Sequence, residues 1–188
     1  SVGRVHPHLE IKIVDENGKV VPRGKLGELC VRGYSVMLGY WEDNDKTQEV
    51  IDVAKWMHTG DIAEMDEEGF VKIKGRIKDV VIRGGENLFP KEIEDFLYTH
   101  PDVSDVQVIG LPDPRYGEEL CACIILHEHH QINEEAIRQY CAEHISHNKV
   151  PRYVRFFTEF PMTASGKAQK FKLQELMRQE LNLLEDIA

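Results

Sequence analysis

The chain has 188 residues, of which 41% are apolar and 30% charged, a balance typical of a globular protein with one ordinary domain or two small ones. Its 33 acidic residues against 23 basic ones give a net charge of -10, which disfavours non-specific binding to nucleic acid or to an anionic membrane. An anionic ligand would therefore need a local concentration of basic side chains.

The cysteines have neither the spacing of a zinc site nor that of a CxxC pair; they are Cys30, Cys121, Cys123 and Cys141. Two of them lie in an apolar run, so we expect all four to be reduced and buried in an intracellular protein, cytoplasmic or, in a eukaryote, mitochondrial. No run approaches 18 consecutive apolar residues, and no transmembrane segment is expected. Ser1 is expected to lie in mid-domain, so the lack of a leader carries no information.

Residues 1–77 are expected to form a mostly β lobe. Apolar alternation on both sides of Asn17-Gly18 predicts a hairpin over residues 9–21, because this dipeptide tolerates positive φ. The other elements expected here are strands at 28–32 and 70–74 and a short helix at 43–51.

Residues 78–188 are expected to form a small α+β domain with a three-stranded sheet and helices, which places the chain in the α+β class. Pro90 suits a first helical position, Pro101 stops the same helix, and Asn133 is a suitable N-cap for the next. The expected strands are 80–83, 103–110, 119–127 and 152–157. The expected helices are 90–100, one from Asn133, and a last one with Leu173, Leu176, Met177, Leu181 and Leu184 on one face.

Three segments expected to be loops carry residue types suited to binding phosphate rather than to packing: 59–61, 75–87 and 163–167. Each signal is weak alone, since a Thr-Gly-Asp or Gly-Gly sequence is usually a turn. Gly166-Lys167 is not a Walker loop, because the residue after the lysine is neither Ser nor Thr.

Taken together, these segments resemble motifs of the adenylate-forming superfamily of acyl-CoA synthetases, luciferases and peptide-synthetase adenylation domains. The matching blocks are GELCVRG at 27–33 with GYW at 39–41, WMHTGD at 56–61, GRIKD at 75–79 and PMTASGK at 161–167. The resemblance covers essentially the whole chain. The stretches at 117–123, 145–151 and 169–173 look most like medium-chain fatty acyl-CoA synthetases and less like aryl-acid ligases.

The resemblance implies a ligase that works in two steps. A carboxylate attacks the α-phosphate of ATP to give acyl-AMP and pyrophosphate, and the thiol of CoA then attacks the acyl carbonyl to release AMP. Residues 1–77 would end the large adenylation domain, and 78–188 would be a mobile lid that turns at Lys78 to present a different face in each step. The cofactors implied are CoA and ATP with Mg²⁺, whose ligands would lie mainly outside this chain.

The same resemblance implies roles for individual residues. The carboxylate of Asp61 would hold the two ribose hydroxyls of the adenylate, Arg76 would reach the ribose and phosphate, and Thr59 would lie at the same cofactor site. Lys167 would be the catalytic lysine of the first lid face.

The second lid face would present Gly84 and Gly85, whose lack of side chains lets the backbone pass close to the pantetheine arm of CoA. A phosphate-binding role of Arg83 is less firmly implied. Lys170 and Lys172 are expected to be solvated charges on the last helix.

Other interpretations stay open. The chain could be a separate lid module that binds CoA or a protein, or part of a ligase for an aryl or other acid. His127, His129 and His130 could bind a metal, but a polar loop explains them better, and no metal site is predicted. The phosphate loop, the adenine-stacking residue and the acyl pocket are not among these residues, so the chain alone is expected to be inactive and, with apolar surface uncovered, to self-associate weakly.

Overall fold

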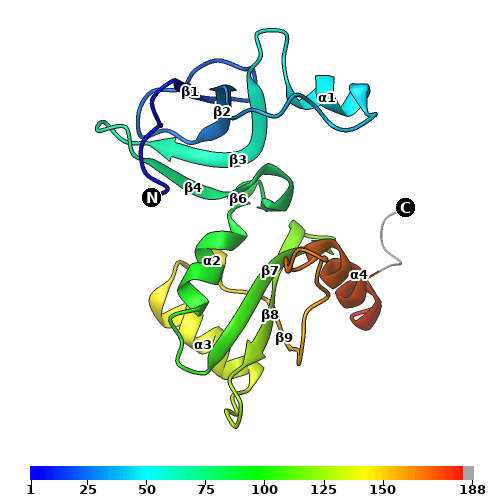
Figure 1. Ribbon diagram of the computed structural model, residues 1–188. Helices are drawn as coiled ribbons and strands as arrows, with labels where there is room; N and C mark the ends of the chain where they lie inside the picture. The colour runs from blue at the N-terminus through cyan, green and yellow to red at the C-terminus, as the bar shows by residue number, and fades with distance from the viewer. Residues whose placement is uncertain (184–188) are drawn as a thin grey trace. The chain divides into compact units, whose positions relative to one another are not determined.

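The computed structural model describes residues 1–183 and divides the chain into two compact units, Ser1–Lys78 and Asp79–Ala188 (Figure 1). Each unit has its own sheet and its own buried apolar residues. The mixture of strands and helices confirms the predicted α+β class. None of the described helices combines the length and the apolar character needed to span a membrane.

The first unit is built on an antiparallel sheet in the order β1-β2-β3-β4. Its small core contains Ile13, Ala63 and Val71. Asp43 caps the one α-helix of this unit, because its carboxylate accepts a hydrogen bond from the Lys46 N–H. The elements are β1 (Leu9–Val14), β2 (Gly27–Gly33), α1 (Asn44–Val50), β3 (Met57–Met65) and β4 (Val71–Arg76), followed by the 3-10 helix η1 (Ile77–Asp79).

The predicted hairpin over residues 9–21 is present in short form. After the turn Val20 forms an isolated antiparallel bridge to Val14, and the Val21 N–H donates to the Ile13 carbonyl at 2.9 Å, while β1 pairs along its whole length with β2. Another expectation for this unit is wrong. Residues 59–61, expected to be a loop, lie inside β3. The sequence did not indicate this strand, because its polar residues interrupt the apolar alternation.

The second unit contains a five-stranded sheet rather than the three strands expected. Strand β8 pairs with β7 along its whole length. Strand β5 also pairs with β8, at Gly117, and β9 pairs with β8 along residues 121–124. Two of the five strands are very short: β5 and β6 form a hairpin that joins β8 only through Arg83 opposite Gly117. The elements are β5 (Val81–Arg83), β6 (Glu86–Leu88), α2 (Pro90–Leu97), β7 (Val103–Asp113), β8 (Gly117–Leu126), α3 (Glu134–His144), the 3-10 helix η2 (His147–Lys149), β9 (Tyr153–Phe156) and α4 (Lys170–Glu180).

Local sequence explains where the helices of this unit begin. Pro90 occupies the first turn of α2, where a missing N–H costs nothing. Asn133 caps α3 through its side-chain oxygen, which accepts the Ala136 N–H at 2.8 Å. Helix α3 then serves as the crossover that lets β9 run parallel to β8.

Strand β8 is buried on both faces. Leu120, Ala122 and Ile124 belong to the core packed by α2 and α3, whereas Cys121 and Cys123 belong to the core packed by α4. Figure 1 shows α2 and α3 on one side of the sheet and α4 on the other. All four cysteines are free thiols and buried, which confirms the prediction from their apolar surroundings.

The predicted apolar face of the last helix is only partly correct. Leu173 and Met177 are buried, and Leu181 packs against them just after α4 ends, but Leu176 is exposed. Leu184 lies outside the described residues.

Leu173→Ala is expected to lower the free energy of unfolding of the second unit by about 2–5 kcal/mol, because it leaves a cavity in place of a fully buried side chain. Leu176→Ala, on the same helix but with Leu176 46% exposed, is the matched control and should change stability by less than about 0.5 kcal/mol. Urea denaturation followed by far-UV circular dichroism measures both variants, while Trp41 and Trp56 report the first unit by fluorescence. Equal losses would contradict the packing of α4.

Candidate functional site

The Thr-Gly-Asp sequence forms a bulge in β3. The pairing of β2 with β3 passes from Cys30 opposite His58 to Glu28 opposite Ile62, so two positions along β2 correspond to four along β3. Gly60 within this bulge has a φ of 70°, a conformation that glycine adopts without strain. Bulges of this kind redirect the side chains beside them.

Side-chain hydrogen bonds hold the bulge in place. The Thr59 hydroxyl donates to the Leu29 carbonyl at 2.8 Å and accepts the Asp61 N–H at 3.1 Å. The Gly60 N–H donates to Glu28 Oε1 at 3.1 Å. The hydroxyl of Thr59, a predicted cofactor-site residue, is thus engaged with the backbone of the bulge.

Asp61 and Arg76 form a cross-strand pair. They are directly opposite each other in the register of β3 and β4, and Arg76 Nε lies 3.0 Å from Asp61 Oδ1. The Asp61 side chain is 25% exposed and that of Arg76 52% exposed. The first unit therefore brings two predicted site residues together as one solvent-accessible polar pair.

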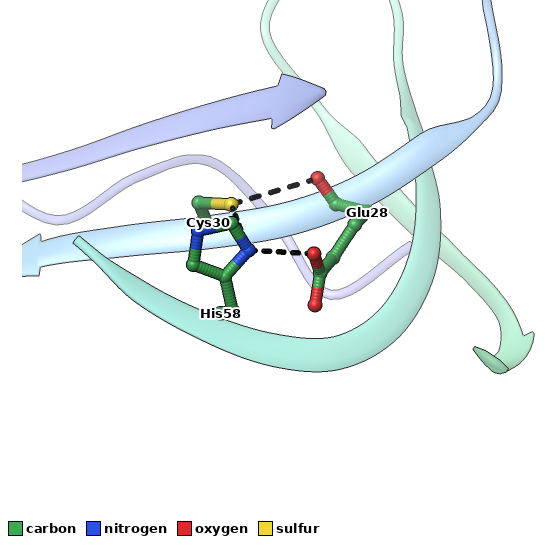
Figure 2. A group of neighbouring side chains, drawn as sticks. All are labelled: Glu28, Cys30 and His58. Carbon is green, nitrogen blue, oxygen red and sulfur yellow. Dashed lines mark hydrogen bonds and ion pairs between the residues drawn. The ribbon is translucent and has the colours of Figure 1, made fainter. Parts of the chain in front are cut away.

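A second polar cluster lies beside the bulge and consists of Glu28, Cys30 and His58 (Figure 2). His58 Nδ1 lies 2.6 Å from Glu28 Oε2, and the Cys30 sulfur lies 3.5 Å from the same nitrogen. Burial raises the pKa of Cys30 to about 11, and the Glu28 carboxylate adds to this increase. Cys30 is therefore a neutral thiol at physiological pH.

These three residue types are all zinc ligands, and their donor atoms lie within 4.8 Å of one another. The 2.6 Å separation of His58 Nδ1 and Glu28 Oε2 is nevertheless a hydrogen-bond distance. Two ligands placed tetrahedrally at about 2.0 Å from one zinc ion would be roughly 3.3 Å apart. The geometry is that of a hydrogen-bonded cluster.

The histidines considered from the sequence are not gathered in the same way. His130 Nδ1 lies 2.5 Å from Asp102 Oδ1, and the centres of the His127 and His130 rings are 5.9 Å apart. Within residues 1–183 they do not form a group of three ligands.

Gly84 and Gly85 form the turn between β5 and β6. Both have positive φ, 59° and 86°, which explains why glycine occupies these positions. The Gly84 N–H donates to the Tyr116 carbonyl at 2.8 Å, so the turn is tied to the loop between β7 and β8.

Arg83 anchors this glycine turn through a buried carboxylate. Its Nε and Nη2 donate to the two oxygens of Glu119 at 2.8 and 2.9 Å, and its guanidinium lies 4.8 Å from the centre of the Tyr116 ring. Glu119 is 1% exposed, and its hydrogen bonds raise the pKa of Arg83. Arg152 extends the network to Asp113 at 2.6 Å. The guanidinium of Arg83 is thus committed to holding the turn.

Lys167 is exposed at the end of a hydrogen-bonded turn. The Thr163 N–H donates to the Lys167 carbonyl at 2.8 Å, and the Thr163 hydroxyl accepts the Lys167 N–H at 3.0 Å. Gly166, with a φ of 76°, donates its N–H to the Thr163 carbonyl at 2.9 Å. The backbone that carries the lysine is therefore fixed while its ammonium group faces solvent.

The expectation that Lys170 is a solvated charge is wrong. Its ammonium lies 2.6 Å from Glu94 Oε1 and donates to the Val108 carbonyl at 3.0 Å, and its side chain is 21% exposed. The sequence could not show this pair, because Glu94 is 76 positions away. Lys170 attaches the start of α4 to α2 and β7 and so steadies the turn of Lys167, whereas Lys172 is exposed as expected.

The predicted site residues fall into two groups. The first unit holds Thr59, Asp61 and Arg76, together with Lys78, which is exposed within η1; the second holds Gly84, Gly85 and Lys167. Sequence reasoning missed the side chains that support them, namely Glu28, Tyr116, Glu119 and Thr163. Only Glu119 could have been found from the sequence. It is a charged residue in an otherwise apolar strand, and a buried charge requires a partner.

Comparison with known proteins gives matches along this chain. Residues 1–41 match the family model described as AMP-binding enzyme, and residues 92–167 match the AMP-binding enzyme C-terminal domain. The mitochondrial medium-chain acyl-CoA ligase ACSF2 of Bos taurus is 57% identical over 184 residues, 97% of this chain. The chain belongs to the AMP-binding enzyme family.

Two further relatives support the assignment of this AMP-binding enzyme chain. The human medium-chain acyl-CoA ligase ACSF2 is 53% identical over the same 97% of the chain. The crystal structure of ATP-bound MatB from Rhodopseudomonas palustris superposes with a TM-score of 0.88 at 34% identity, over 95% of this chain and 36% of MatB. The chain spans 30% of the length of the two ACSF2 relatives.

Glu119→Ala in the AMP-binding enzyme chain is expected to lower the free energy of unfolding of the second unit by roughly 3–5 kcal/mol, because it leaves the largely buried Arg83 guanidinium without its partner. Asp95→Ala is the control, since it removes an exposed pair with Lys91 and should cost less than about 0.5 kcal/mol. Urea denaturation followed by circular dichroism compares them. A loss below 1 kcal/mol for Glu119→Ala would contradict the anchoring role.

Proposed function

We propose that the chain is the C-terminal portion of an ATP-dependent, AMP-forming ligase that joins a fatty acid to CoA. The observation that carries the proposal is 57% identity over 97% of the chain to a medium-chain acyl-CoA ligase. In this proposal residues 1–77 are the last lobe of the adenylation domain and 78–188 are the lid. An intracellular location fits the four free thiols.

Asp61 and Arg76 hold the ribose of the nucleotide in this proposal. A carboxylate accepts hydrogen bonds only, which suits it to a pair of ribose hydroxyls. The cross-strand contact of Arg76 Nε with Asp61 Oδ1 at 3.0 Å supports the assignment, because it orients this carboxylate. The neighbouring guanidinium also supplies positive charge for a phosphate.

Lys167 acts in the first step, in which acyl-AMP and pyrophosphate form. An ammonium about 4 Å from a phosphate oxygen is worth about 4 kcal/mol at an effective dielectric of roughly 20, before desolvation is subtracted. The interaction strengthens as charge builds on the phosphate, so it favours the transition state over the bound substrate. The hydrogen bonds of Thr163 support this role, since they restrain the lysine backbone.

The second step uses the other lid face. Rotation at Lys78 brings the Gly84-Gly85 turn to the acyl-adenylate, and the absence of side chains leaves room for the pantetheine arm of CoA. The anchored Arg83 supports this assignment, because it fixes the turn before CoA arrives. We place the Mg²⁺ ligands mainly outside this chain, and likewise the phosphate loop and the acyl pocket, so that the chain alone is inactive.

Lys167→Ala in the complete enzyme is expected to lower acid-dependent pyrophosphate exchange by two or more orders of magnitude, corresponding to roughly 3 kcal/mol, because the developing phosphate charge loses its cation. Thioester formation from preformed acyl-AMP and CoA should be largely retained, since it uses the other lid face. The two half-reactions are measured separately.

Lys172→Ala is the matched control for Lys167→Ala, because Lys172 is an exposed lysine five positions further along the chain. It should leave both half-reactions unchanged. Unchanged pyrophosphate exchange in Lys167→Ala would show that Lys167 is an ordinary loop lysine.

We also propose that the isolated 188-residue chain self-associates weakly. Leu38, Trp41 and Val53 of the first unit are each at least 90% exposed, which is unusual for large apolar side chains. The sedimentation coefficient is expected to rise with concentration, and Trp41→Ser is expected to reduce the rise, while Phe171→Ser in the second unit serves as the control. A single monomeric species at high concentration in sedimentation velocity would disprove the proposal.

A further inference from the structure

We propose that Glu28 is a positioning residue for Asp61, acting by holding open the bulge of β3 through contacts with His58 and Gly60. This inference rests on the proposed function, in which Asp61 binds the ribose hydroxyls of the nucleotide. It assigns the Glu28, Cys30 and His58 cluster to nucleotide binding rather than to a metal.

Glu28 uses both carboxylate oxygens on the bulged strand. Oε2 lies 2.6 Å from His58 Nδ1 (Figure 2). Oε1 accepts the Gly60 N–H at 3.1 Å, so the two contacts lie on either side of Thr59 in the sequence. The Thr59 hydroxyl separately accepts the Asp61 N–H at 3.1 Å. The effect of Glu28 on Asp61 therefore passes through the backbone of Gly60, which Glu28 Oε1 holds and which is covalently joined to Asp61.

The bulge needs such an acceptor, because it interrupts the strand ladder. In β2 and β3 the cross-strand partners resume only at Glu28 and Ile62, so Gly60 cannot use a ladder carbonyl there. A half-buried N–H without an acceptor costs about 1–3 kcal/mol, and the backbone would rearrange to avoid that cost. The Asp61 side chain, which follows Gly60 directly, would then lose its alignment with Arg76.

The charges around Glu28 fit this role. Glu28 is 20% exposed and His58 33% exposed, so the contact between them is only partly screened by solvent. Cys30 is fully buried, and its raised pKa of about 11 keeps it from adding a second negative charge beside Glu28. One carboxylate, one imidazole and one neutral thiol make a satisfied cluster without a metal.

The test compares ATP with 2′-deoxyATP as substrates of the complete enzyme. An intact Asp61 site should prefer ATP, because the deoxy analogue leaves part of the Asp61 carboxylate without its hydroxyl. Glu28→Ala is expected to lower this preference at least tenfold, equivalent to about 1.4 kcal/mol. It should raise the KM for ATP while leaving those for the fatty acid and CoA unchanged.

Two further variants separate positioning from folding. Glu28→Gln keeps an acceptor for Gly60 and can donate to His58 in its other tautomer, so it should restore most of the preference for ATP. Glu28→Asp keeps the charge on a side chain one methylene shorter, and should reduce the preference even where Glu28→Ala does not fold. Glu10→Gln, which breaks the exposed pair with Arg32 in the same sheet, should leave the preference unchanged.

Asp61→Ala distinguishes failure of the inference from failure of the proposed function. A preference lost in Asp61→Ala but kept in both Glu28→Ala and Glu28→Asp would overturn the role of Glu28 alone. A preference kept in Asp61→Ala would overturn the ribose-binding assignment and the inference with it. One equivalent of zinc bound by the purified enzyme and lost in Glu28→Ala would identify the cluster as a metal site and also overturn the inference.

Discussion

Burial of β8 on both faces is the constraint on which the second unit depends. A strand with apolar side chains on each face must be covered twice, and each fully buried aliphatic side chain contributes about 1.5–3 kcal/mol. The core packed by α2 and α3 contains Leu120 and Ile124, and the core packed by α4 contains the smaller Cys121 and Cys123. Lys167 lies just before α4, and the Gly84-Gly85 turn is joined to the start of β8. The packing of β8 therefore fixes the positions of both loops.

Both units then use the same device to shape a loop. In each, a glycine adopts a positive φ, and a carboxylate from a neighbouring strand holds that backbone conformation. Glu28 accepts the Gly60 N–H directly, whereas Glu119 acts on the Gly84 turn through Arg83. The glycine makes the conformation accessible, but it leaves many others accessible too. The carboxylate selects one of them, so the geometry is present before a ligand binds, which is the condition for efficient electrostatic stabilisation.

The sequence predicted elements whose signal is local. Asn133 identified the start of α3, and Pro90 identified that of α2. The continuous run of apolar residues from Leu120 identified β8. Sequence reasoning failed where pairing is non-local: β3 is polar at its bulge, and β6 is only three residues long. Candidate site residues such as Asp61 came from a resemblance of motifs, since no spacing rule places Asp61 opposite Arg76. Their supporting carboxylates were missed because each lies at least 30 positions from the group it holds.

The distribution of ion pairs explains how an acidic chain can present a cation to an anionic ligand. Among residues 1–183, ten of the 23 Lys and Arg side chains form an ion pair with a carboxylate. Lys149, Lys170, Arg83 and Arg155 each lie within 3 Å of one. Among the ion pairs of residues 1–183, Lys167 takes part in none, and its contacts run through the backbone of its turn. Its ammonium is therefore free of internal neutralisation while its main chain is held still. A phosphate approaching this turn meets a cation that no carboxylate has to release first.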